Sequence, residues 1–93
     1  MFSYKNHLKT IAESQGYCLG LESYYLNQDD SISAKRYSRL AGDFSRQLLK
    51  VRNRALIYSN VKRQECLEIE YQGVKNGKVQ ASFNLLGQAY ACS

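Results

Sequence analysis

Residues 33–59 place the strongest constraint on the fold, because they carry an amphipathic pattern of helical period. The apolar side chains recur every three or four residues, at Tyr37, Leu40, Ala41, Phe44, Leu48, Val51 and Ala55. At about 100° per residue they occupy one arc of a helix, roughly 100° wide. Six cations occupy a similar arc nearly opposite: Lys35, Arg36, Arg39, Arg46, Lys50 and Arg54. The pattern predicts a helix that begins near Ser33, ends between Arg52 and Ser59, and exposes a basic face. Gly42 inside it costs roughly 1 kcal/mol relative to alanine, too little to break the helix.

Charge is distributed very unevenly along the chain. The formal net charge is +5, but the segment from Ser31 to Arg63 holds nine basic residues against one acid, Asp43, a net of +8. The rest of the chain holds four basic residues against seven acids. A segment this basic favours an anionic partner, either a nucleic acid or an acidic protein surface.

The N-terminal part predicts a short helix. Ser3 can serve as its N-cap, and apolar residues repeat at helical spacing from Tyr4 to Ala12 before Gly16 ends the helix. Residues 17–26 are ambiguous, because their alternation favours a strand while a helical turn also fits. A polar turn at 27–30 follows, and the cap of the next helix is Asp29, Asp30 or Ser31.

The C-terminal third predicts a β-hairpin, because apolar and polar residues alternate on both sides of residues 75–78. A two-residue Asn-Gly turn would set apolar against polar side chains across the strands. A three-residue loop with Gly77 at positive φ instead pairs Tyr71 with Ala81, and a bulge at Gly73 would restore the register equally well.

These elements predict an α+β fold in a single domain, residues 1–93. Two helices, a short N-terminal one and a long basic amphipathic central one, pack on a small antiparallel sheet that ends in the C-terminal hairpin. The apolar stripe of the central helix is expected to cover the hairpin. Exposed hairpin edges would allow a homodimer as well as a monomer.

Several kinds of site are not indicated by the sequence. The three cysteines, Cys18, Cys66 and Cys92, are odd in number and widely spaced, which fits neither a disulfide framework nor a metal site and indicates reduced thiols. No signal peptide or membrane-spanning run is evident, so a cytoplasmic protein without a membrane partner is expected. We expect no enzyme activity, cofactor or metal.

Two pairs of residues could in principle support chemistry. His7 and Cys18 could form a nucleophile pair, and Glu68 with Glu70 could act as paired carboxylates. The simpler interpretation is that the thiols belong to the core and that both glutamates keep the outer face of a strand hydrated. Neither pair predicts catalysis.

Binding is the better-supported prediction. The cations of the central helix could contact successive phosphates, and Tyr24, Tyr25 or Tyr58 could stack on bases. Two further lysines would project from the hairpin tip into a groove. The predicted binding residues are Lys35, Arg36, Arg39, Arg46, Lys50, Arg54, Lys75 and Lys78.

In size and style the chain resembles the small proteins that phages and other mobile elements make to disable host defence, of which anti-CRISPR proteins are the best known. It is short, and it lacks a catalytic motif. The resemblance implies a protein of the bacterial cytoplasm that inhibits a host nucleoprotein, a CRISPR surveillance complex, by occupying its surface. Many such proteins are acidic DNA mimics, whereas this basic chain points to binding near guide RNA or in an acidic protein groove.

The alternative function is an independent nucleic-acid-binding regulator. The cations lie along the flank of a long helix, without the short two-helix unit that major-groove readers use. This arrangement favours the interaction protein over the regulator.

Overall fold

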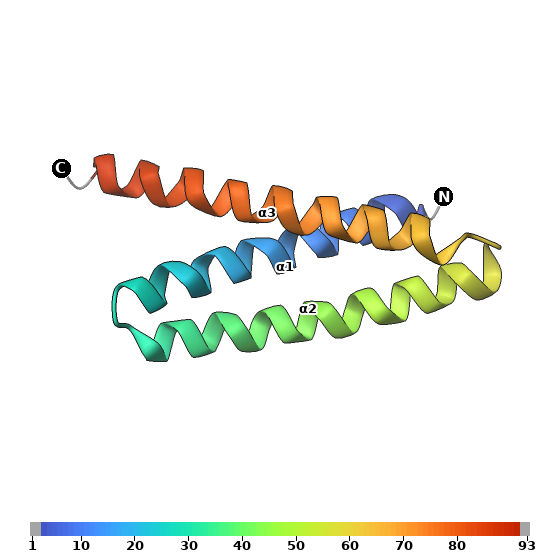
Figure 1. The fold of residues 1–93 in the computed structure, drawn as a ribbon, viewed down its shortest axis with the longest axis horizontal. Helices are drawn as coiled ribbons and strands as arrows, with labels where there is room; N and C mark the ends of the chain where they lie inside the picture. Colours follow the sequence, from blue (N-terminus) through green and yellow to red (C-terminus); the bar gives the residue numbers. More distant parts are fainter. Residues whose placement is uncertain (1–2, 92–93) are drawn as a thin grey trace.

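The computed structural model describes the backbone of residues 3–91 and the side chains of residues 3–86. It consists of three long helices: α1 (Tyr4–Asn27), α2 (Ser31–Tyr58) and α3 (Arg63–Ala91). Figure 1 shows α1 lying between the other two, with α3 running in the same direction as α1 and α2 running in the opposite direction. The arrangement is elongated, 51 × 23 × 21 Å along its principal axes.

The predicted α+β fold is wrong. Residues 3–91 contain no strand, so there is no antiparallel sheet and no C-terminal hairpin on which the helices could pack. The hairpin edges that suggested a homodimer are therefore absent from this part of the chain. None of the described helices is apolar enough over a sufficient length to cross a membrane.

Helix α2 forms where its periodicity predicts it, and its N-cap is Asp30. The Asp30 carboxylate accepts a hydrogen bond from the backbone N–H of Ser33, with a distance of 3.1 Å between Oδ1 and the nitrogen. Hydrogen bonding by Ser33 lowers the pKa of Asp30, so the cap is expected to support α2 at neutral pH and to weaken as the carboxyl becomes protonated in acid. Asp29, in the preceding turn, adopts a left-handed conformation with φ 59°, which aspartate tolerates better than most residues.

Helix α1 is longer than its sequence pattern predicts. Its N-cap is Ser3, as expected, with the Ser3 hydroxyl accepting from the backbone N–H of Asn6. However, Gly16 does not end the helix, which continues through Gly20 to Asn27. The ambiguous residues 17–26 are thus helical. Gly16 was interpreted as the residue that ends the helix, but it lies in the middle of α1. A glycine is needed at this position because the backbone of a neighbouring helix occupies the space that a side chain would take.

That neighbour is α3, and the contact explains why residues 67–85 form a helix. The two helices meet along small residues spaced four apart, which we call the glycine interface: Ala12, Gly16 and Gly20 of α1, and Gly73, Gly77 and Ala81 of α3. A Cβ atom on Gly16 would overlap the carbonyl oxygen of Val74, and one on Gly77 would overlap that of Glu13. Small residues at this spacing let two helix backbones approach closely. The glycines expected to form a turn and a bulge are thus packing positions in a helix.

The apolar stripe of α2 covers α1 and not a hairpin. Ala34, Ala41, Leu48 and Ala55 are buried on this face of α2. Leu48 and Ala55 join a cluster with Leu8 and Ile11 of α1 and with Cys66 of α3. Since α1 supplies the contact surface for both neighbours, α2 and α3 make few direct contacts.

Among the side chains that the structure describes, one ion pair joins α2 to α3. The Arg52 guanidinium donates to both carboxylate oxygens of Glu70, at N–O distances of 3.0 and 3.1 Å. Their side chains are only 16% and 12% exposed. The pair therefore removes Arg52 from the exposed cations and fixes the start of α3 against α2.

Candidate functional site

The six predicted cations of α2 form one exposed surface, which we call the basic face: Lys35, Arg36, Arg39, Arg46, Lys50 and Arg54. All six are exposed because the opposite side of α2 packs on α1. From the first to the last cation the face extends roughly 28 Å along the helix axis, at 1.5 Å per residue. The helix thus holds its cations in a row on a rigid rod.

One acid interrupts the basic face. Asp43 forms an ion pair with Arg46, and both side chains are exposed. Among the side chains that the structure describes, the other five cations of the face make no ion pair. Asp43 therefore separates a cluster of three cations at the N-terminal end from Lys50 and Arg54 at the C-terminal end.

The predicted lysines Lys75 and Lys78 do not belong to this surface. They lie three residues apart on α3, both exposed, and not at a hairpin tip. Since α3 contacts α2 little and packs on α1, the structure does not bring these two lysines together with the basic face.

A shallow hollow lies at the N-terminal end of the basic face. We call it the Ile32 hollow; it is lined by Ile32, Lys35, Arg36, Arg39, Leu40 and Asp43. Ile32 is 78% exposed and Leu40 is 40% exposed. Sequence reasoning missed both: Ile32 precedes the expected start of the helix, and Leu40 was counted in the buried stripe. The spacing 32, 36, 39, 43 on one helical face was the signal that could have identified Ile32.

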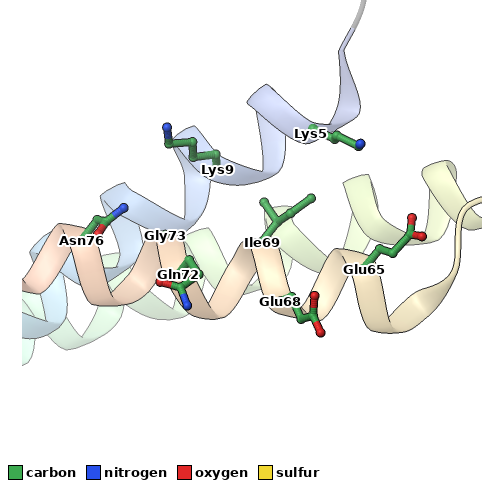
Figure 2. Close-up of a pocket in the computed structure, with 8 residues that line it drawn as sticks. All are labelled: Lys5, Lys9, Glu65, Glu68, Ile69, Gln72, Gly73 and Asn76. Atoms are coloured by element: carbon green, nitrogen blue, oxygen red, sulfur yellow. The ribbon is translucent and has the colours of Figure 1, made fainter.

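A second hollow lies between the N-terminal halves of α1 and α3 (Figure 2). Its rim carries Lys5 and Lys9 from α1 and Glu65 and Glu68 from α3, with Ile69 between them. All four charged side chains are exposed. The hollow is thus an open groove with a solvated, charged rim.

The candidate catalytic pairs find no support in the geometry. Cys18 and Cys66 are buried free thiols, and burial raises the pKa of both, away from the reactive thiolate. His7 is exposed. Glu68 and Glu70 lie on a helix and not on a strand, and Glu70 is taken up by Arg52. Cys92 lies outside the described residues, and within them no group of His, Cys, Asp or Glu side chains could hold a metal ion.

The candidate stacking tyrosines have separate roles. The ring of Tyr25 stacks on Tyr37 of α2, with centroids 5.6 Å apart and planes 5° apart. Tyr24 meets Tyr25 edge-on, with centroids 5.1 Å apart. The stack of Tyr25 on Tyr37 ties the end of α1 to α2, whereas the contact between Tyr24 and Tyr25 lies within α1. Tyr58, in contrast, is 81% exposed at the end of α2 and remains available to a ligand.

Comparison with known proteins adds no relative: no family model matches the chain, and neither the curated proteins nor the solved structures include a significant match.

Proposed function

We propose that this protein is a non-catalytic binding protein that docks the basic face of α2 on an anionic macromolecular surface and acts by covering that surface. The observation that supports this most is the row of six exposed cations on one side of a single helix, interrupted by one acid. Four of the six are arginines, whose planar guanidinium groups make bidentate contacts with carboxylates and phosphates.

The form of α2 fits a large partner better than a small ligand. A row of cations roughly 28 Å long matches an extended surface, and the packing of α2 on α1 holds the row straight. In the form that the resemblance implies, the partner is a host nucleoprotein, a CRISPR surveillance complex in the bacterial cytoplasm, which the protein inhibits sterically. The basic face supports this form.

A nucleic-acid-binding regulator is the second candidate. The observation in its favour is Tyr58, an exposed aromatic one helical turn beyond Arg54 of the basic face, because exposed aromatics beside cations can stack on bases. Against it, the three helices are 24, 28 and 29 residues long and form no short recognition unit.

Neutralising one end of the basic face tests the proposal. The triple variant Lys35→Gln, Arg36→Gln, Arg39→Gln should bind anionic probes at least about tenfold more weakly and with a shallower salt dependence, because three charge contacts are lost. Binding is measured by fluorescence anisotropy at two salt concentrations. The probes are a 12-residue poly-glutamate peptide, a 20-base-pair DNA duplex and a 20-nucleotide RNA.

The matched control removes the same charge elsewhere. The triple variant Lys9→Gln, Lys75→Gln, Lys78→Gln lowers the net charge equally but leaves α2 intact, so its affinity should stay within about twofold of the unmodified protein. Equal losses in the two triple variants would show that net charge alone drives binding. That result would contradict a docking role for the basic face.

A further inference from the structure

The Ile32 hollow combines two kinds of side chain that are usually separate on a protein surface. The exposed aliphatic side chains of Ile32 and Leu40 line the hollow together with three cations, Lys35, Arg36 and Arg39, and one carboxylate, that of Asp43. These residues lie on one side of the first turns of α2, at spacings of three and four residues. Ile32 is 78% exposed, so it contributes little to the stability of the free protein.

We propose that the Ile32 hollow binds an acidic segment of a partner protein that also carries an apolar side chain. Carboxylates of the segment pair with Lys35, Arg36 and Arg39, and its apolar side chain packs on Ile32 and Leu40. This inference rests on the proposed function and names the class of partner that the basic face recognises.

The exposed cations, and not the helix N-terminus, make the Ile32 hollow favourable for carboxylates. The N-terminus of α2 is already capped by the carboxylate of Asp30, which accepts from the backbone N–H of Ser33, so the attraction comes from Lys35, Arg36 and Arg39. Arg36 and Arg39 can each hold a carboxylate in a bidentate contact. Ionic contacts at an exposed site are weak individually, and an apolar contact beside them supplies much of the missing affinity.

The same hollow is poorly suited to nucleic acid. Bases are held on exposed aromatic rings, but no aromatic side chain lines the hollow, and the nearby Tyr37 is stacked on Tyr25. The side chains of Ile32 and Leu40 have neither a charge nor a hydrogen-bond donor with which to bind a phosphate. Asp43 also lines the hollow, and a phosphate backbone following the whole basic face carries a charge at every nucleotide, whereas an acidic segment can place an uncharged residue beside Asp43.

Peptide binding with and without apolar residues tests the inference. The first probe is a fluorescent 12-residue peptide of eight glutamates and four leucines. The second is the same peptide with serine in place of each leucine, and the third is a 12-nucleotide oligo(dT). The leucine peptide should bind about tenfold more tightly than the serine peptide of equal charge, and more tightly than the oligonucleotide.

One substitution and one control locate the effect. Ile32→Asn should abolish the roughly tenfold advantage of the leucine peptide. Ile57→Asn, on the same helix, should leave it intact, because Ile57 is 72% exposed but lies outside the hollow. Both side chains are exposed, so circular dichroism should show two folded variants.

The possible outcomes separate this inference from the proposed function. If Ile32→Asn binds the leucine peptide as the unmodified protein does, while the Lys35, Arg36, Arg39 triple variant loses it, the basic face binds anions but the hollow does not select an apolar side chain. Tighter binding to the oligonucleotide than to the leucine peptide would instead assign the face to nucleic acid. Either result overturns the inference.

Discussion

Gly77→Ala should destabilise the protein by about 3 kcal/mol in the free energy of unfolding, at the upper end of what overpacking costs. The added methyl group would overlap the carbonyl oxygen of Glu13 on α1. That atom belongs to a helix backbone and cannot move away alone, so α1 and α3 must separate along the glycine interface. Urea denaturation followed by circular dichroism measures the change.

Gly42→Ala is the matched control, because it places the same methyl group in another helix interior. Nothing lies within 4 Å of the position that a Cβ atom would take at Gly42. Alanine should therefore stabilise the protein by roughly 1 kcal/mol through its helix propensity. If Gly77→Ala also stabilised the protein, the result would contradict the close contact between α1 and α3 along the glycine interface.

The second large effect is expected at the ion pair between Arg52 and Glu70. Arg52→Ala leaves the Glu70 carboxylate without its partner in a site where it is only 12% exposed. The free energy of unfolding should fall by about 2 kcal/mol, somewhat less than the roughly 3–5 kcal/mol that breaking a fully buried pair typically costs. Because both substitutions break the same contact, the double variant Arg52→Ala, Glu70→Ala should lose clearly less free energy of unfolding than the sum of the losses in the two single variants.

The exposed pair between Arg46 and Asp43 provides the comparison. Their side chains are 71% and 50% exposed, so Arg46→Ala should change stability by less than about 1 kcal/mol. Chemical denaturation of the single and double variants gives both coupling energies. Additive effects at Arg52 and Glu70 would show that the pair does not hold α2 and α3 together.

Helix α2 could be predicted from sequence because one physical requirement determines its pattern. A helix that buries one face and exposes the other must repeat every 3.6 residues, and α2 does so from Ala34 to Ala55. The same reasoning placed the six cations correctly on the exposed side. It also narrowed the N-cap to three residues, of which the structure selects Asp30.

The rest of the fold depends on a contact between segments far apart in sequence. Gly73 and Gly77 favour a turn or a bulge when residues 67–85 are considered alone. The four-residue spacing of Gly73 and Gly77 indicates a helix only when it is compared with the same spacing of Gly16 and Gly20, on the helix against which they pack. The close packing of the two helix backbones then outweighs the low helix propensity of glycine. The local alternation of apolar and polar residues gives no sign of this contact, because the partner residues lie far away in the sequence.

The candidate site was predictable only in part for the same reason. The charges of α2 are local and could be identified in the sequence, but Lys75 and Lys78 were misplaced along with the hairpin. Arg52 differs from the exposed cations because it pairs with Glu70 on another helix, and this contact cannot be identified from the sequence of α2 alone. Ile32 was missed because the predicted helix began one residue too late to include it.

The most direct test of the central claim, that the basic face of α2 is the binding surface, is to map the contact by nuclear magnetic resonance. Backbone amide shifts of the labelled protein are recorded while the 12-residue poly-glutamate peptide is added. We expect the shifts that change to cluster between residues 31 and 55 of α2. Changes centred on Lys75 and Lys78 of α3, or spread evenly over the three helices, would contradict the claim.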